Sequence, residues 1–164
     1  MIEINHVSKT FGTKKAVDDI TVTIPTGCIT GFIGPNGAGK TTSIHMMTGV
    51  LQPDTGSIKL NGKDITKDPI EAKREFGLVP DSPDLFLRLS GLEYINFMAD
   101  LYHIDTATRN ARIKALAEQF EIQDALNDRM SSYSHGMRQK AILIATLVTD
   151  PNIWILDEPM TGLD

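Results

Sequence analysis

Apolar and polar residues alternate in two segments near the start of the chain, residues 2–6 and 20–24. Such alternation is typical of strands in a sheet that has one buried and one wetter face. A third segment, residues 57–65, is interrupted by Asn61-Gly62, a pair that accepts the positive φ angles of a two-residue hairpin turn. The N-terminal part of the chain is therefore predicted to contain antiparallel β-structure.

A continuous apolar run at residues 28–33 indicates a buried strand, and the run at residues 153–156 indicates a short apolar strand. Cys28 begins the first run, so we expect it to be a small core residue and not a reactive thiol. It is the single cysteine of the chain, so an intramolecular disulfide is excluded, which fits a reducing cytoplasmic compartment. Residues 69–74 suit a short helix with proline in its first turn, and residues 76–79 suit a short strand.

From Asp81 onward the periodicity becomes helical. Ser90 and Glu93 have the spacing of a capping box, and the apolar residues that follow predict stripes that face a core. The stripes comprise Ile95, Met98, Leu101 and Tyr102, then Ile113, Leu116, Ala117 and Phe120 on a helix starting near Thr106. An inserted helical subdomain is the expected architecture of this region.

The most specific motif is Gly-Pro-Asn-Gly-Ala-Gly-Lys-Thr-Thr at residues 34–42, which fits the phosphate loop G-x-x-x-x-G-K-[ST]. The predicted strand before it and the predicted helix after it supply the context that this motif needs. Glycines let the backbone N–H groups close around a phosphate at the helix N-terminus. Lys40 would reach the β- and γ-phosphates, and the Thr41 hydroxyl would ligate Mg²⁺. The alternative is a glycine-rich turn with a solvated lysine.

Two adjacent carboxylates, Asp157 and Glu158, follow the predicted strand 153–156. Beside a bound triphosphate, Asp157 would hold Mg²⁺ through a water, and Glu158 would act as the general base that polarises the attacking water. The alternative is a strand that ends in a solvated acidic turn. A complete phosphate loop in the same chain favours the catalytic interpretation.

A second glycine-containing segment, Tyr-Ser-His-Gly-Met-Arg-Gln at residues 133–139, opens an apolar helix over residues 141–148. A small hydroxyl and a glycine at a helix start form a second anion site. This segment resembles the signature of the ATP-binding cassette (ABC) family, whose usual form is Leu-Ser-Gly-Gly-Gln, with a Tyr-Ser-x-Gly-Met variant in bacterial exporters. Thr161-Gly162-Leu163-Asp164 is similar to the family's D-loop. The resemblance extends over essentially the whole chain.

The resemblance implies an α/β fold: a P-loop NTPase sheet core with an N-terminal antiparallel β portion and an inserted helical subdomain. It divides the chain into a nucleotide-binding core (1–80), the helical subdomain (81–150), and the Walker B strand with the D-loop (151–164). It also implies head-to-tail dimers, in which each ATP lies between the phosphate loop of one copy and the signature of the other.

Residue roles carried over from the family follow its motifs. Ser134 and Gly136 would contact the γ-phosphate across the interface, and Asp164 would align the two sites. Phe11 falls where the family has an aromatic residue stacked on adenine, with an ordinary core residue as its alternative. The expected nucleotide contacts are Phe11, Gly34, Pro35, Asn36, Gly37, Ala38, Gly39, Lys40, Thr41, Thr42, Ser134, Gly136 and Asp164, and the expected catalytic residues are Glu158 and Lys40.

Two features depart from the family pattern. Asp81 stands where the family usually has a glutamine that senses the metal and lies near the contact with the membrane subunits. Asp81 is therefore a further candidate for Mg²⁺, and it has either a coupling-loop function or a place in a simple turn after Pro80. The chain ends at Asp164, before the segment that holds the family's switch histidine. We therefore expect an N-terminal part of a longer cassette that binds ATP with little or no turnover.

Net charge and hydropathy reduce the number of function classes that fit the chain. A formal charge of −5 lacks the basic balance of a nucleic-acid-binding protein, so no nucleic-acid partner is expected. The longest apolar stretch, residues 141–148, is too short to span a membrane, and the start has no signal-peptide pattern. We expect a cytoplasmic ATPase subunit of an ABC transporter, peripheral on the membrane and bound to separate membrane-spanning subunits.

The signature variant favours export, and the cassette would pair as a homodimer or heterodimer. A soluble ABC ATPase of translation or DNA maintenance is the alternative. A P-loop kinase or GTPase is a third class. The signature-like segment argues against a kinase, and the lack of an Asn-Lys-x-Asp motif argues against a GTPase.

Overall fold

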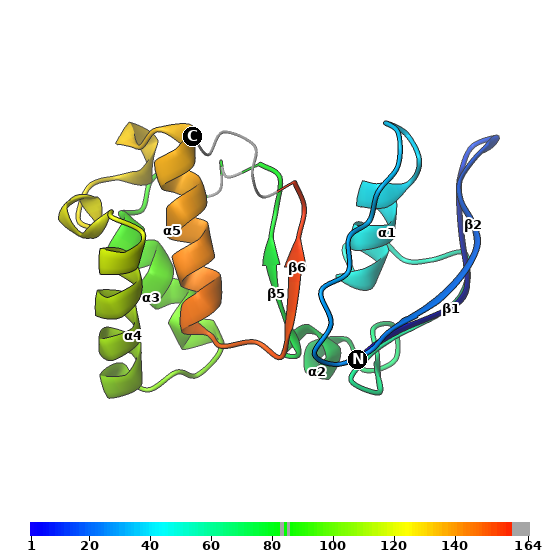
Figure 1. Cartoon of the computed structure of the whole chain (residues 1–164), viewed down its shortest axis with the longest axis horizontal. Coiled ribbons are helices and arrows are strands. Elements are labelled where there is room, and N and C mark those ends of the chain that lie inside the picture. Colours follow the sequence, from blue (N-terminus) through cyan, green and yellow to red (C-terminus); the bar gives the residue numbers. More distant parts are fainter. Residues whose placement is uncertain (83, 85, 159–164) are drawn as a thin grey trace. The chain divides into compact units, whose positions relative to one another are not determined.

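The computed structural model describes residues 1–82, 84 and 86–158. The chain divides into two compact units, Met1–Phe76 and Gly77–Asp164, and each has its own arrangement of helices and strands (Figure 1). The fold is mixed α/β with antiparallel N-terminal strands, as the sequence predicted.

The first unit is built on a four-stranded antiparallel sheet with the order β2-β1-β3-β4. Its strands are β1 (Ile2–Phe11), β2 (Lys14–Ile24), β3 (Thr55–Leu60) and β4 (Lys63–Asp64). The predicted hairpin turn is confirmed, since Asn61 and Gly62 have φ angles of 48° and 81°. Alternation along β1 and β3 places Ile4, Ile58 and Leu60 in the core.

Two helices belong to this unit, α1 (Lys40–Met47) and α2 (Pro69–Lys73). Met46 and Met47 of α1 are buried, and α1 contacts both β2 and β3, whereas α2 contacts β4. The sheet and α1 therefore enclose one apolar core, which holds the start of α1 in place.

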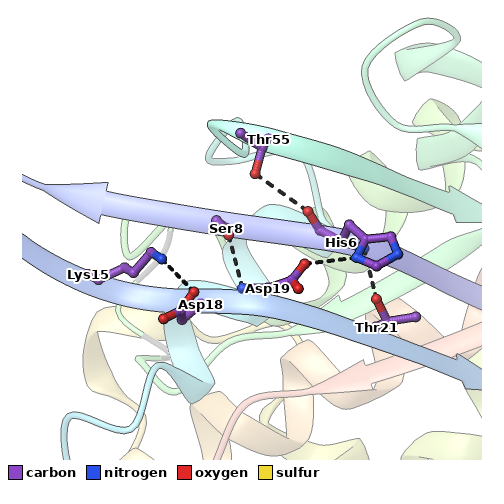
Figure 2. Close-up of polar contacts among 7 residues, drawn as sticks. All are labelled: His6, Ser8, Lys15, Asp18, Asp19, Thr21 and Thr55. Carbon is purple, nitrogen blue, oxygen red and sulfur yellow. Dashed lines mark hydrogen bonds and ion pairs between the residues drawn. The ribbon is translucent and has the colours of Figure 1, made fainter.

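Paired β-bulges interrupt β1 and β2 at His6 and Asp19, which both have a φ of 50°. Figure 2 shows how side chains satisfy the bulged backbone: the His6 N–H donates to Thr21 Oγ1 at 3.0 Å, and the Asp19 N–H donates to Ser8 Oγ at 2.9 Å. The two bulged side chains also meet, with His6 Nδ1 and Asp19 Oδ1 at a hydrogen-bond distance of 2.9 Å. A Cβ on Gly56 of β3 would lie 2.4 Å from the His6 carbonyl oxygen, so the neighbouring strand is also shaped around the bulge.

The second unit packs three helices around an apolar core. Its elements are β5 (Phe76–Val79), α3 (Gly91–Leu101), α4 (Thr106–Gln119), the 3₁₀ turns η1 (Gln123–Ala125) and η2 (Met130–Ser132), α5 (His135–Val148) and β6 (Ile153–Leu156). Both α3 and α4 contact α5, the central helix in Figure 1, and β5 pairs with β6. Ile95, Ile142 and Ile144 are fully buried. No helix within the described ranges is long and apolar enough to cross a membrane.

Two expectations from the apolar pattern were wrong. Residues 28–33 form no strand, Cys28 is exposed, and Ile29 and Ile33 are almost completely exposed. A strand needs a neighbour for its backbone hydrogen bonds, and no strand in the described part of the chain pairs with this segment. Leu101 was expected in the core but is 55% exposed, because it ends α3 beyond the buried stretch.

Candidate functional site

The phosphate loop has the backbone conformation that its glycines predict. Gly37 and Gly39 have φ angles of 82° and 89°, a region that other residues rarely adopt. A Cβ on Gly39 would lie 2.4 Å from the carbonyl oxygen of Ala16 in β2. Only glycine therefore lets the loop press against the sheet and enter α1 in this direction.

The start of α1 has no side-chain cap within the described residues. Most helices satisfy their first-turn N–H groups with a Ser, Thr, Asp or Asn side chain. Gly39 has no side chain to offer, although its carbonyl oxygen accepts from the Ser43 N–H at 2.8 Å. The first turn of α1 therefore presents donors and a positive dipole end to an anion.

Lys40, the first residue of α1, folds back over the loop. Its Nζ donates to the carbonyl oxygens of Gly34 and Pro35, at 2.9 and 3.2 Å. These neutral acceptors hold the ammonium beside the exposed loop residues, where phosphate oxygens would be stronger acceptors. Thr41, the next residue, is exposed.

Phe11 ends β1 beside the hairpin turn and is 51% exposed. It pairs with Lys14, two residues before Ala16, against which the phosphate loop packs. The Lys9 ammonium lies 5.9 Å from the centre of the Phe11 ring, and Asp54 holds that ammonium in an ion pair of 2.6 Å. The core alternative for Phe11 is wrong, because half of the ring is open to a stacking partner.

The acidic pair lies at the end of β6. Alternation along the strand continues into it, so Asp157 is buried and Glu158 is exposed. The Asp157 N–H donates to the Val79 carbonyl of β5 at 2.9 Å. Glu158 has a φ of 47°, and such strain in a residue other than glycine is frequent at functional sites. The turn therefore sends the two carboxylates in different directions.

Ser134 is the N-cap of α5 and is exposed. Its Oγ accepts from the Met137 N–H at 3.2 Å. The hydroxyl proton is not used in this bond, so it stays available to donate to a phosphate oxygen. Gly136 lies in the first turn of α5, where the absent side chain leaves the backbone open.

Tyr133, buried immediately before the N-cap of α5, holds the start of that helix in place. Its hydroxyl donates to the Ala125 carbonyl at 2.5 Å, and burial raises the pKa of this phenol, which keeps the donor protonated. A Cβ on Gly91 would lie 2.4 Å from the same hydroxyl. The ring therefore seats the start of α5 against the start of α3.

Two further residues, Asp81 and Asp164, were predicted to take part in the site. Asp81 is exposed. Asp164 and the D-loop lie outside the described residues. In the described part of the chain no three His, Cys, Asp or Glu side chains cluster as a metal site. A magnesium ion bound with a triphosphate would instead take most of its ligands from phosphate and water, which suits Mg²⁺. The two predicted protein ligands, Thr41 and Asp157, belong to different units.

Sequence reasoning missed one basic residue beside the signature. Arg138 lies in the first turns of α5, bound to Asp84 at 2.6 Å and to the Met130 carbonyl at 3.1 Å. A cation near a helix N-terminus opposes the helix dipole. That conflict was visible in the sequence and could have identified Arg138.

Comparisons with known proteins agree with this geometry. The sequence pattern of the ABC transporter family matches residues 17–161. The ABC transporter ATP-binding protein NatA of Bacillus subtilis (strain 168) is 38% identical over 169 residues, which cover 100% of this chain and 69% of NatA. The Nod factor export ATP-binding protein I of Paraburkholderia xenovorans (strain LB400) is 34% identical, over 99% of this chain and 54% of that protein.

A solved structure of the ATP binding subunit of an ABC transporter superposes with a TM-score of 0.94 at 29% identity, over 100% of this chain and 68% of that one. The chain spans from about half to about two thirds of the curated relatives it matches. A family match over most of the sequence, joined to a phosphate loop at an uncapped helix start, gives one conclusion: this chain belongs to the ABC transporter family.

Proposed function

We propose that this chain binds MgATP at residues 34–42 and supplies the ATP-binding part of an ABC transporter. The uncapped start of α1, entered through Gly39 with its φ of 89°, carries this proposal. The loop N–H groups and Lys40 hold the β- and γ-phosphates, and Phe11 stacks on adenine. Thr41 and Asp157 would hold the Mg²⁺ that accompanies ATP, and this ion would neutralise phosphate charge.

Hydrolysis in the complete protein uses Glu158 as the base. The carboxylate takes a proton from water as the water oxygen attacks the γ-phosphorus, and the bond to the β–γ bridging oxygen breaks to release ADP. The exposed position of Glu158 beside buried Asp157 supports this division of labour. Little or no turnover is expected from these 164 residues alone.

ATP-driven head-to-tail association of two copies is the proposed power stroke. The phosphate loop of one copy and Ser134 with Gly136 of the other enclose the γ-phosphate, and Asp164 aligns the two sites. The exposed Ser134 hydroxyl, whose proton is not used in the bond from the Met137 N–H, supports this role. Membrane-spanning subunits are the proposed partners, and the cytoplasmic face of the membrane is the proposed location.

Export is the proposed direction. The Tyr133 to Met137 segment has the exporter-like form, and one relative is an export ATP-binding protein by name. An ATP-binding subunit whose relatives are transporter proteins is favoured over a soluble cassette of translation or DNA maintenance.

ATP binding is tested by titrating the chain with a fluorescent ATP analogue, with and without Mg²⁺. We expect saturable binding that ATP competes away.

Head-to-tail association is tested by sedimentation of mixed variants, Lys40→Ala with Ser134→Ala. Each variant alone loses both composite sites, whereas the mixed pair retains one intact site and should recover part of the ATP-dependent association. Equal association of the two variants alone and mixed would contradict the head-to-tail arrangement.

A further inference from the structure

A guanidinium bridge holds the start of α5 to two segments that precede it in the sequence. Arg138 Nε donates to the Met130 carbonyl at 3.1 Å, and its Nη1 donates to Asp84 Oδ1 at 2.6 Å. The Arg138 side chain is 21% exposed and Asp84 is 58% exposed. The bridge is therefore a partly buried contact, where screening by water is weaker than at the open surface.

The bridge lies at one end of a series of backbone hydrogen bonds between residues 87–92 and 126–131, called the seam below. The N–H groups of Met130 and Ser131 donate to the carbonyls of Leu89 and Leu87, at 2.8 and 3.0 Å. The Leu92 N–H donates to the Leu126 carbonyl at 2.8 Å. Residues 87–92 and 126–131 are thus linked by backbone hydrogen bonds, and a shift of one segment is passed to the other.

The seam leads directly to Ser134. Ser134 lies four residues after Met130, which is in the seam, and the buried Tyr133 stands between them. Four residues after Ser134, Arg138 returns to the seam and binds it from the other side. The helix start that carries Ser134 is therefore held on both sides. Met130 and Ser131 bind residues 87 and 89 before it, and Arg138 binds Asp84 and Met130 after it.

We propose that Arg138 is a positioning residue that orients Ser134 and the first turn of α5 according to the position of Asp84. This inference rests on the proposed function, because the group to be oriented is the phosphate donor Ser134. A change in the position of Asp84 then changes how well the signature accepts the ATP of a neighbouring copy.

The opposite end of α5 offers a matched control. Arg112 donates to the Val148 carbonyl at 2.8 Å and to Asp150 Oδ2 at 2.9 Å, and the two side chains are 33% and 72% exposed. Asp150→Asn therefore removes an ion pair of the same kind from the same helix, far from Ser134.

The test compares Asp84→Asn, Arg138→Gln, Arg138→Lys and the double variant Asp84→Asn/Arg138→Gln in the 164-residue chain. Hydrogen exchange of the Met137 amide, which donates to Ser134 Oγ, reports the first turn. We expect about fivefold faster exchange in Asp84→Asn, the size of a partly buried ion pair. The Met137 amide should exchange no faster in the double variant than in Arg138→Gln. Its exchange rate should be intermediate in Arg138→Lys and unchanged in Asp150→Asn.

A second readout separates positioning from simple stabilisation. ATP-dependent association should weaken about fivefold in Asp84→Asn, while the affinity of the phosphate loop for ATP and the association of Asp150→Asn stay unchanged. Unchanged Met137 exchange, or faster exchange with undiminished association, would overturn the inference. If the unsubstituted chain does not associate with ATP, the proposed function fails, and the exchange rates alone decide whether Arg138 positions Ser134.

Discussion

The starts of α1 and α5 are both candidate phosphate sites, yet they are built in opposite ways. α1 follows Gly39 and has no side-chain cap among the described residues, whereas α5 follows Ser134, whose hydroxyl accepts from the Met137 N–H. The first helix start therefore leaves its donors to an outside anion, whereas the second has one of its donors, the Met137 N–H, satisfied by its own chain.

This difference predicts an order of events. The open donors of α1 and the Lys40 ammonium favour binding of ATP to a single copy. Ser134 has only its spare hydroxyl proton to offer, so its contact adds to a phosphate that is already held. We therefore expect ATP binding to the loop to precede association of two copies.

The largest expected effect comes from Gly39→Ala. The new Cβ would lie 2.4 Å from the Ala16 carbonyl oxygen at a φ of 89°, so strain and overlap together should lower the free energy of unfolding by about 2–4 kcal/mol. Gly62→Ala is the control, because its φ is 81° but nothing lies within 4 Å, and it should lose about 1 kcal/mol. Equal losses in urea unfolding would show that the loop is not pressed against β2.

Lys40→Ala tests the open helix start directly. Removing two charge-assisted hydrogen bonds to phosphate should raise the Kd for ATP about 100-fold, or ~2.7 kcal/mol. Lys67→Ala makes the same charge change at an exposed lysine outside the loop and should leave the affinity within about twofold. Fluorescence titration measures both, and equal effects would reduce Lys40 to a general charge contribution.

Substitutions at Ser134 separate capping from phosphate donation in α5. Ser134→Ala should lower the stability by about 1 kcal/mol through loss of the cap and also weaken ATP-dependent association. Ser134→Asp keeps a good capping acceptor but lacks a proton to donate and repels phosphate. We expect it to retain stability in urea unfolding and to lose association in sedimentation. Full association of Ser134→Asp would exclude the serine from phosphate contact.

The smallest effect concerns α3, a helix start with a complete capping box. Hydrogen bonds from the Ser90 N–H and hydroxyl hold the pKa of Glu93 below its ordinary value. A depressed folded-state pKa gives stability that is present above the unfolded-state pKa, about 4.3, and is lost as the pH falls through the folded-state value. Thermal unfolding of wild type and Glu93→Gln should therefore differ at pH 7 and converge near pH 3. A difference that is independent of pH would contradict this role.

Local patterns were sufficient for much of this fold. Alternation identified β1 and β2, Asn61-Gly62 identified the hairpin turn, and Ser90 with Glu93 identified the start of α3, because each feature depends on neighbours in sequence. The phosphate loop was found in the same way. Its nine residues define both the left-handed glycines and the helix start that follows.

Features that depend on distant partners were not predictable. The segment 28–33 has the composition of a buried strand, but composition does not supply a neighbour with which to pair. Arg138 and Asp84 are 54 residues apart, so their contact depends on how α5 packs. The bulges at His6 and Asp19 interrupt an alternating pattern without altering its composition, and so they left no readable signal.

The paired bulges also determine how β1 and β2 tolerate insertions and deletions. The residue numbers of paired partners sum to 26 at Ile4–Val22, to 27 at Val7–Ile20, and to 26 again at Lys9–Val17, before a further register shift at Thr10. Between Ile4 and Lys9, each bulge therefore cancels the offset made by the other. Deleting either His6 or Asp19 alone would leave the two strands out of step by one residue from Lys9 and Val17 onward. A double deletion would preserve the pairing there, so the two positions are expected to be gained or lost together.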